Sequence, residues 1–352
     1  MNHIRALDGL RALAVSIVFV AHCGLERLVP GGLGVTIFFF LSGYLITSLL
    51  RSEVAQLGKV DLRGFYMRRT LRIWPSLYLT VAFTGLVSLF MPIDPPIQAT
   101  GVVAQLAFLS NYAGQLGLGA GVPWIPLWSL AVEEHFYLLF PILFATILLG
   151  RAPRTIALWC AVGCLLVLAV RIVSVPLLGE NIGQIYYWSH TRIDSILFGC
   201  CLALWQNPVL DEAAWRPKPW HFAAAVAVLL LCLLVRSELF RQTLRYTLQG
   251  AALFVIFSFV IWDRGLIARW LSCRPARLIG LYSYTLYLVH VPIIELIRFL
   301  RPGLPILAMI PIAGVLSMLY AAAMYRLVEA PAARWRRSLH RVDADVDMVP
   351  AG

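Results

Sequence analysis

Residues 33–50 read LGVTIFFFLSGYLITSLL, a run without any Asp, Glu, Lys or Arg. A helix needs about 20 predominantly apolar residues to cross the hydrocarbon core of a bilayer, with roughly 17 to 25 tolerated. Eight further runs are as clear as this one, and one more is weaker. We therefore predict an all-α, polytopic integral membrane protein with about ten transmembrane helices. The predicted spans are residues 10–29, 33–50, 73–91, 127–149, 155–175, 187–206 (the weaker run), 219–235, 246–262, 278–299 and 303–327.

The composition of the whole chain supports this prediction. Of its 352 residues, 60% are hydrophobic and 13% are charged, whereas soluble domains carry about 25% charged residues. The mean hydropathy of +0.80 excludes an ordinary water-soluble enzyme. Lys and Arg (29) outnumber Asp and Glu (18), but they form short clusters between apolar runs. This pattern favours membrane lipid over nucleic acid as a partner.

The seven cysteines fall mostly within apolar stretches, and the sequence has no CxxC motif and no histidine cluster at metal-ligand spacing. We therefore predict neither a disulfide framework nor a metal site. The first apolar run lacks a small-residue cleavage site, so we interpret it as a retained signal anchor. Residues 1–341 are predicted to form one transmembrane domain and residues 342–352 a disordered tail.

The distribution of basic residues predicts the orientation. With both termini in the cytoplasm, 21 of the 29 Lys and Arg residues fall on cytoplasmic segments, as the positive-inside rule requires. Counting residues 99–109 as a span would invert the later segments, so we interpret that short run as re-entrant or interfacial. Residues 92–127 contain no Lys or Arg. They become the longest external segment, which we expect to cover a site from outside.

Three ionisable residues occur in or beside the first span: Asp8, Arg11 and His22. Eleven residues at 100° each make three turns plus about 20°, so Arg11 and His22 share a helix face about 16 Å apart. Asp8 lies on that face too. Ionisable groups in a span are costly and usually functional. We therefore favour a functional role over the alternative of a topology anchor and a packing histidine.

The next basic group lies in FYMRRTLRIWP, residues 65–75. Arg69 and Arg72 are three residues apart and share a helical face. Their guanidinium groups suit a phosphate or pyrophosphate on a cytoplasmic ligand, and we include Arg68 with them. The alternative is a topology anchor that contacts anionic lipid.

The fourth span begins with WSLAVEEHFY, residues 128–137. It places two carboxylates and an imidazole within one helical turn. Glu133 and Tyr137 are four residues apart and face the same way, whereas Glu134 projects about 100° from them. The alternative, a helix end near the outer water layer, accounts for one glutamate better than for the whole group.

Two later groups complete the set of polar residues. Arg192 and Asp194 open the sixth span, and we expect them to form an ion pair near its outer side. In the ninth span, Tyr287 and His290, preceded by Tyr284, step by three along one helix face. This face is either a hydrogen-bonded strut or part of the chemistry.

Together these residues resemble the membrane acyltransferase 3 family. Five blocks occur in order across nearly the whole chain: RALDGLRALAV (5–15) leading to His22, GVTIFFFLSGY (34–44), RRTLRIWP (68–75), WSLAVEEHFY (128–137) and SYTLYLVHVP (283–292). The resemblance implies a multi-pass protein of the bacterial cytoplasmic (inner) membrane. It implies an O-acyltransferase that moves an acyl group, with acetyl expected, from cytoplasmic acyl-CoA as co-substrate to a hydroxyl. The implied acceptor is a sugar, peptidoglycan, lipopolysaccharide, Nod factor, macrolide or other hydroxylated glycan or glycolipid.

The resemblance also implies roles for individual residues. The family pattern of an arginine and a histidine separated by ten residues falls on Arg11 and His22. The RxxR pattern, which is thought to serve the CoA donor, falls on Arg69 and Arg72. The Ser-Leu-x-x-Glu pattern ends on Glu133.

Transfer from a thioester to an alcohol needs a base for the hydroxyl proton, and histidine is suited to this role near neutral pH. We predict that His22 is the general base, supported by Glu133. Asp8 is a poorer support because it lies about 21 Å along the same helix. A covalent acyl-histidine is the alternative route. The donor to the developing oxyanion stays open among Arg11, Tyr287 and His290.

Two other classes of function remain open. A proton-coupled transporter or flippase of a glycan or lipid-linked substrate would use Arg11, His22, Glu133 and Glu134 as a proton relay. Inverted half-repeats would favour a transporter, but the sequence does not show them. A structural partner subunit is the third class, and it would not need His22 or the arginine pair. The residues assigned to substrate contact or support are Asp8, Glu134, Tyr137, Arg192, Asp194, Tyr287 and His290.

Overall fold

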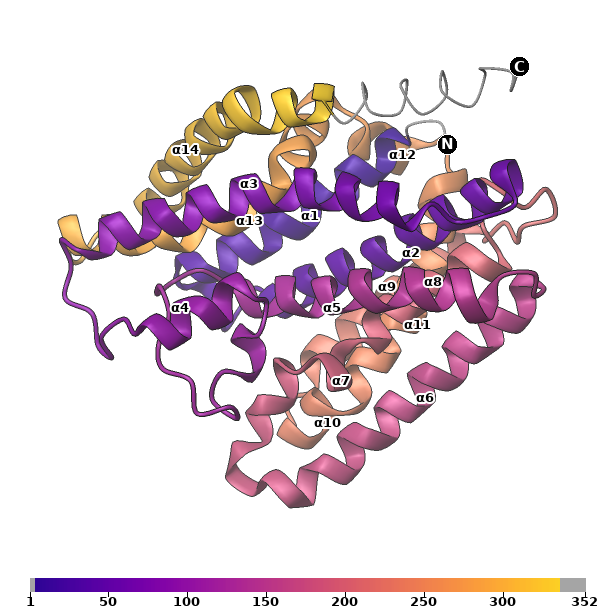
Figure 1. The fold of residues 1–352 in the computed structure, drawn as a ribbon, viewed down its shortest axis with the longest axis horizontal. Helices are drawn as coiled ribbons and strands as arrows, with labels where there is room; N and C mark the ends of the chain where they lie inside the picture. Colours follow the sequence, from indigo (N-terminus) through magenta and orange to yellow (C-terminus); the bar gives the residue numbers. More distant parts are fainter. Residues whose placement is uncertain (1–3, 336–352) are drawn as a thin grey trace, which may run out of the picture.

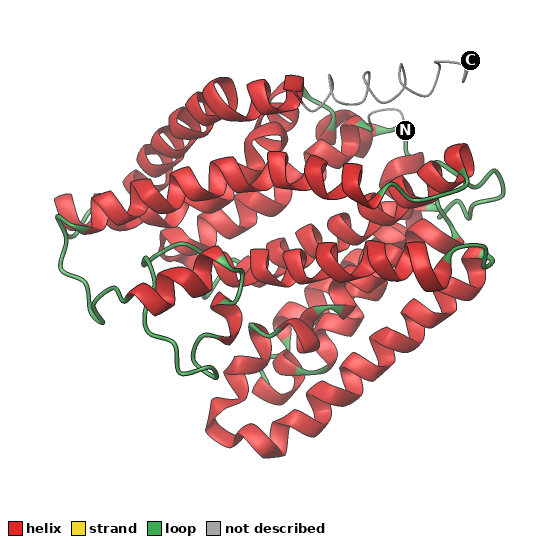
Figure 2. Ribbon diagram, in the orientation of Figure 1, coloured by secondary structure: helices red, strands yellow, loops and turns green. Residues whose placement is uncertain are grey.

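The structure, a computed structural model, describes residues 4–335, and these form helices and loops with no strand among them (Figure 2). The all-α prediction is confirmed, and the predicted tail, 342–352, lies outside the described residues. In chain order the helices are α1 Arg5–Val20, η1 Ala21–Leu25, α2 Gly31–Leu57, α3 Leu62–Ser88, α4 Ala99–Leu106, η2 Ser110–Tyr112, α5 Leu127–Leu143, η3 Phe144–Leu148, α6 Pro153–Leu178, η4 Gly179–Tyr186, α7 Ser189–Arg192, α8 Asp194–Trp205, α9 Pro219–Leu234, α10 Glu238–Gln242, α11 Leu244–Trp262, α12 Leu266–Leu271, α13 Arg274–Leu300, α14 Ile306–Met324 and η5 Tyr325–Glu329.

Seven of the described helical segments are long and apolar enough to cross a membrane, so the chain is a multi-pass membrane protein. They contain α1, α2, α5, α6, α11, α13 and α14. Helices α8 and α9 are shorter apolar helices, and α3 carries the basic group of residues 63–72. A helix therefore occurs at each of the ten predicted spans. The number of crossings and the cytoplasmic position of both termini stay predictions.

The short run at 99–109 forms α4, a helix of 8 residues. At 1.5 Å per residue it is about 12 Å long, far less than the roughly 30 Å hydrocarbon core. This length agrees with its interpretation as a segment that does not cross.

Helix α2 lies at the centre of the bundle, with 78% of its most apolar window buried, whereas α14 has only 22% of its window buried. Helices α6 and α14 lie on opposite sides of the bundle (Figure 1). Helix α1 packs against both α2 and α13, and α2 packs against α8. His22 follows α1 and His290 lies in α13, so both are carried by helices near the centre of the bundle. The predicted site arginines lie in α1 and in α3, which packs against α13.

Glycines allow two of these helix pairs to approach closely. A Cβ atom on Gly43 of α2 would collide with the backbone oxygen of Ile196, and one on Gly199 of α8 would collide with that of Phe40. Likewise, a Cβ on Gly280 of α13 would overlap the backbone of α1 at Asp8. In lipid, no hydrophobic force drives helices together. Close packing of backbones at small residues contributes to helix association instead.

Two helix ends differ from the sequence prediction, and both differences concern functional candidates. Helix α3 begins at Leu62, not near residue 73, because Asp61 caps it by accepting a hydrogen bond from the Gly64 amide at 2.9 Å. The basic group is therefore helical throughout. Helix α1 continues into the π-helical turn Ala21–Leu25, which contains His22 and where Gly24 has φ +109°. Such π turns often occur at functional sites.

The predicted ion pair between Arg192 and Asp194 is wrong. Asp194 instead pairs with Arg171 of α6 at 2.7 Å, and both side chains are fully buried. Residues two apart on a helix do not face each other, and here the chain also breaks between α7 and α8 at Ile193. The Arg192 guanidinium lies over the Tyr246 ring at 3.8 Å.

Replacing Arg171 by methionine is expected to lower the free energy of unfolding by about 3–5 kcal/mol, because the Asp194 carboxylate is left buried without a counter-ion. The double variant Arg171→Met/Asp194→Asn removes both charges and is expected to recover most of the loss. Denaturant titration in mixed micelles measures both. Wild-type stability of the single variant would show that the pair does not hold α6 to α8.

Candidate functional site

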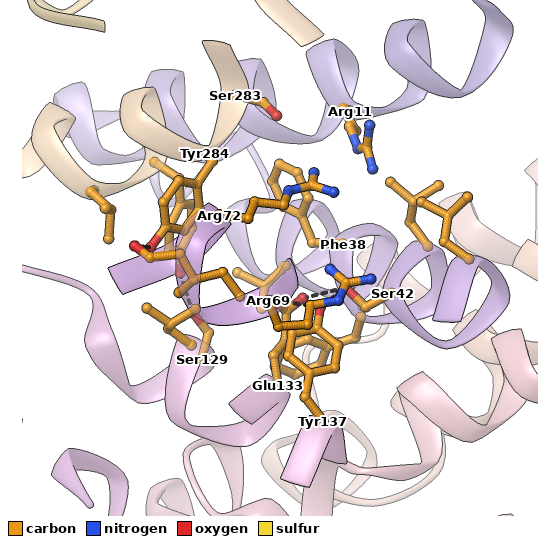
Figure 3. A pocket seen from close by; sticks show the side chains of 18 residues that line it. Arg11, Phe38, Ser42, Arg69, Arg72, Ser129, Glu133, Tyr137, Ser283 and Tyr284 are labelled. Atoms are coloured by element: carbon orange, nitrogen blue, oxygen red, sulfur yellow. Dashed lines mark hydrogen bonds between the residues drawn. The ribbon is translucent and has the colours of Figure 1, made fainter. Parts of the chain in front are cut away.

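The first cavity, here called the inner cavity, lies between α1, α2, α3, α5 and α13 and has a volume of about 100 Å³. It brings together most of the residues that the sequence singled out. Three arginines, Arg11, Arg69 and Arg72, line it from α1 and α3 (Figure 3). The other lining residues used below are Ser42 of α2, Ser129, Glu133 and Tyr137 of α5, and Tyr284 and Tyr287 of α13.

Positive charge dominates the inner cavity. Arg11 is within 3.5 Å of Asp8, its neighbour one turn earlier in α1. Arg69 lies over the Tyr137 ring at 4.8 Å. Neither Arg69 nor Arg72 forms an ion pair with a carboxylate of residues 4–335. Unpaired guanidinium groups beside an apolar-walled cavity are suited to binding an anion.

Glu133 is the one carboxylate that lines this cavity among the described residues. Its Oε1 accepts a hydrogen bond from Ser42 Oγ at 2.7 Å, and Ser42 Oγ accepts one from Tyr137 Oη at 2.8 Å. The prediction that Glu133 and Tyr137 face the same way is confirmed. Glu134 is not among the lining residues of the cavity, and its buried Oε1 has no hydrogen-bond partner in the described chain.

The second cavity, here called the outer cavity, lies at the other end of α1 and has a volume of about 720 Å³. His22 lines it from the π turn. Its walls also carry aromatic rings and arginines: Trp128, Tyr186, Tyr187 and Tyr246, with Arg27, Arg236, Arg241 and Arg245. On the predicted orientation this cavity opens to the external side.

His22 is held by α13. Its Nδ1 lies 3.0 Å from Nε2 of His290, which is 1% exposed. Arg298, in the last turn of α13, donates to the His22 carbonyl oxygen at 3.0 Å. The expected hydrogen-bonding support from Glu133 is therefore not found: Glu133 bonds within the inner cavity, because α5 presents it to α2, whereas α13 faces the π turn of α1.

Hydrogen-bond partners assign the tautomers of the two histidines. Nδ1 of His290 faces two acceptors, the carbonyl oxygens of Leu286 at 3.1 Å and Tyr287 at 2.8 Å, so it carries the hydrogen. In a neutral pair, His290 Nε2 is then an acceptor and His22 Nδ1 must donate to it. Nε2 of His22 is consequently the bare nitrogen, and the His22 side chain is exposed to the outer cavity.

The two cavities share two lining residues, Val35 of α2 and Tyr287 of α13. The hydroxyl of Tyr287 is 2.5 Å from Ser129 Oγ. Tyr287 therefore stands where the cavities adjoin, and its backbone carbonyl is also the partner of His290. Tyr284, which was predicted to share a helix face with Tyr287 and His290, has a different partner. Its Oη donates to the Ile73 carbonyl oxygen at 2.8 Å.

Arg68 is the predicted donor-binding residue that the structure places elsewhere. Its guanidinium lies 3.7 Å from Glu53 and 3.8 Å from Asp61, and it does not line the inner cavity. One residue along a helix rotates the side chain by about 100°, so Arg68 faces away from Arg69.

Sequence reasoning missed Ser42 and the arginines of the outer cavity. Ser42 stood within a quoted motif, but an isolated hydroxyl in an apolar run gives no signal of its bond to Glu133. Arg236, Arg241 and Arg245 had a clearer signal, because external segments otherwise contain few basic residues. No group of three or more His, Cys, Asp or Glu residues suited to a metal ion occurs within residues 4–335.

Comparison with known proteins gives consistent relatives. The chain is 32% identical over 350 residues to the O-acetyltransferase OatA of Staphylococcus aureus (strain NCTC 8325 / PS 47), covering 94% of this chain and 57% of the relative. It is 32% identical over 352 residues to the putative peptidoglycan O-acetyltransferase YrhL of Bacillus subtilis (strain 168), with 94% and 55% covered. It is 29% identical over 351 residues to the peptidoglycan O-acetyltransferase OatA of Listeria monocytogenes serovar 1/2a (strain ATCC BAA-679 / EGD-e), with 94% and 56% covered.

The chain thus spans little more than half the length of these curated relatives. No solved structure matches it. A family model described as an acyltransferase domain matches residues 4–326, which includes both cavities and all five sequence blocks. The chain therefore belongs to the acyltransferase 3 family.

Proposed function

We propose that this protein is a membrane O-acyltransferase that transfers an acyl group, with acetyl expected, from cytoplasmic acyl-CoA to a hydroxyl of a glycan in a bacterial inner membrane. The observation that carries the proposal is the pair of adjoining cavities: arginines line the inner one, a histidine with a bare nitrogen lines the outer one, and Tyr287 lines both. Relatives described as peptidoglycan O-acetyltransferases support peptidoglycan as the first acceptor to test.

The inner cavity is the proposed donor site. The phosphates of CoA carry several negative charges, and Arg69 and Arg72 form no ion pair with a carboxylate of residues 4–335, although Glu133 lines the same cavity. Arg11 lines the same cavity from α1. The rise from Arg11 to His22 is about 16 Å for eleven helical residues, which is comparable to the length of the pantetheine arm. Glu133, through Ser42 and Tyr137, holds the wall beneath Arg69.

The outer cavity is the proposed acceptor site, where His22 acts as general base. His22 Nε2 takes the proton of the acceptor hydroxyl as its oxygen attacks the thioester carbonyl carbon. The carbon–sulfur bond then breaks, and the imidazolium returns the proton to the departing CoA thiolate. Tyr287, whose hydroxyl stands where the cavities adjoin, is the proposed donor to the developing oxyanion. Products are the acyl ester and free CoA, so atoms and charge balance.

The direct test uses purified protein in lipid nanodiscs with radiolabelled acetyl-CoA and soluble peptidoglycan fragments. We expect label to appear on the glycan as a base-labile ester. A protein that binds the glycan and moves it across vesicle membranes without consuming acetyl-CoA would instead be a transporter. That result would end the proposal.

His290 is proposed to position His22. Replacing His290 by leucine removes the acceptor for His22 Nδ1–H, so the imidazole loses its fixed tautomer. We expect kcat to fall about 10-fold to 100-fold, by analogy with the loss seen when the hydrogen-bond partner of a metal-bound histidine is removed, while KM for acetyl-CoA changes little. His290→Gln places an amide oxygen near the same point and is expected to recover most of kcat.

Steady-state kinetics of the two variants separate positioning from folding. A merely structural role would reduce the amount of folded protein in both variants and leave kcat per folded enzyme unchanged. Equal loss of kcat in His290→Gln and His290→Leu would contradict the tautomer argument.

A further inference from the structure

The outer cavity carries a surplus of positive charge. Four arginines line it from separate segments: Arg27 after α1, Arg236 after α9, Arg241 in α10 and Arg245 in α11. The lining carboxylates are Glu26 and Glu180. A neutral sugar does not need such an excess of guanidinium groups.

Most of these arginines are not neutralised by the protein. Arg27 and Arg236 are exposed, and neither forms an ion pair within residues 4–335. Arg245 donates to Tyr246 Oη at 3.1 Å, but its buried Nε has no hydrogen-bond partner in the described chain. Within residues 4–335, only Arg241 of these four has a carboxylate partner, Glu238 at 3.3 Å, and both side chains are almost half exposed. Exposed pairs of this kind contribute about 1 kcal/mol at most.

A fixed charge behind the cavity wall adds to this field. Arg192 is fully buried, and its guanidinium lies 3.8 Å from the ring centre of Tyr246, which lines the cavity. It donates to Thr36 Oγ1 at 3.1 Å, while its Nε and Nη1 have no hydrogen-bond partner in residues 4–335. Asp194 is already paired with Arg171 at 2.7 Å. The three buried side chains therefore carry one net positive charge, poorly screened by water.

The remaining wall suits a sugar ring. Trp128 contacts Tyr186 and Tyr187 with ring centres 4.6 Å and 5.3 Å apart. Aromatic faces cover the apolar C–H face of a sugar. Gln249, whose amide oxygen accepts from Thr36 Oγ1 at 3.4 Å, lines the same cavity.

We propose that the acceptor is an acidic saccharide, one that carries a carboxylate or phosphate group in addition to the hydroxyl that is acylated. Arg236, Arg241 and Arg245 bind the anion while His22, on the same cavity, receives the hydroxyl proton. This inference rests on the proposed acyl transfer and adds the charge class of the acceptor to it.

Binding without an acyl donor tests the charge class separately from catalysis. The protein is placed in phosphatidylcholine nanodiscs, and Kd is measured for methyl β-glucoside, methyl β-glucuronide and glucose 1-phosphate. We expect the two acidic probes to bind at least about 10-fold more tightly than the neutral one, since a hydrogen bond to a charged group contributes about 1.5–3 kcal/mol. The carboxylate and phosphate probes show which anion is preferred.

Arg245→Gln is expected to remove most of that preference while Kd for the neutral glucoside changes less than about 2-fold. Arg236→Gln, at an exposed side chain with no ion pair in residues 4–335, is expected to act in the same direction without disturbing the fold. Arg301→Gln, an exposed arginine at the end of α13 outside the cavity lining, is the matched control and should leave all three affinities unchanged.

Equal affinity for neutral and acidic probes would overturn the inference. Binding of phosphatidylglycerol is measured separately, by adding this lipid to the nanodiscs. An effect of the arginine variants on phosphatidylglycerol binding alone would also overturn the inference, because the arginines would then be a lipid headgroup site. If the acidic preference holds but no acetyl group is transferred to any probe or glycan, the charge class stands and the proposed acyl transfer fails.

Discussion

Replacing His22 by alanine is expected to lower kcat for acyl transfer by about 10²-fold to 10⁴-fold, the range typical for loss of a general base. Of the two paired histidines, His22 lines the outer cavity and His290 is not among its lining residues, and the tautomer argument leaves Nε2 of His22 as the basic atom. Without it, water must take the hydroxyl proton. The measurement is label transfer from radiolabelled acetyl-CoA to peptidoglycan fragments by protein in nanodiscs.

The matched control is His221→Ala. His221 lies at the start of α9, stacks on Trp220 with ring centres 3.5 Å apart and lines neither cavity. It should retain wild-type kcat, so a loss confined to His22→Ala is not a general effect of removing an imidazole. Full transfer by folded His22→Ala protein would exclude both the general-base role and the acyl-histidine route.

The sequence alone located many of the site residues because charge within an apolar run is conspicuous. Arg11, Arg69, Arg72 and Glu133 were all selected in this way, and the structure brings them to one cavity. Spacing along a single helix was also dependable: Glu133 and Tyr137 are four residues apart and share the Ser42 hydroxyl.

Contacts between helices were not predictable from periodicity. A helical wheel shows which residues share a face, but not which helix covers that face. His22 was therefore assigned to Glu133, although its partner is His290, 268 residues away. Asp194 was assigned to the nearest arginine in sequence, although it pairs with Arg171 of the adjacent helix α6.

Helix ends were misplaced for a different reason. Hydropathy excludes charged residues from a span, so the expected start of the third helix fell near residue 73. The cap at Asp61 starts α3 eleven residues earlier. This shift matters for function, because a helical backbone fixes Arg69 and Arg72 on one side and turns Arg68 toward Glu53 and Asp61.

The double variant Arg69→Gln/Arg72→Gln is expected to raise KM for acetyl-CoA by more than about 100-fold, because each lost charge-assisted hydrogen bond contributes about 1.5–3 kcal/mol. We expect kcat at saturating donor to change far less, since these arginines line the inner cavity, whereas His22 lines the outer one. An interaction made equally with substrate and transition state affects KM alone. Donor titrations of label transfer measure both constants.

Arg63→Gln is the control for this double variant, because Arg63 is an exposed arginine of the same helix that does not line the inner cavity. Its KM should equal that of the wild type. Acetyl-dephospho-CoA, which lacks the 3′-phosphate, gives a sharper comparison. If the arginines bind that phosphate, its removal weakens donor binding by the wild type. It then has little further effect on donor binding by the double variant, as expected for two groups that interact directly. Equal weakening of both proteins would place the 3′-phosphate elsewhere and leave the pyrophosphate as the group bound by the arginines. An unchanged KM for acetyl-CoA in the double variant would leave Arg69 and Arg72 without a role in donor binding.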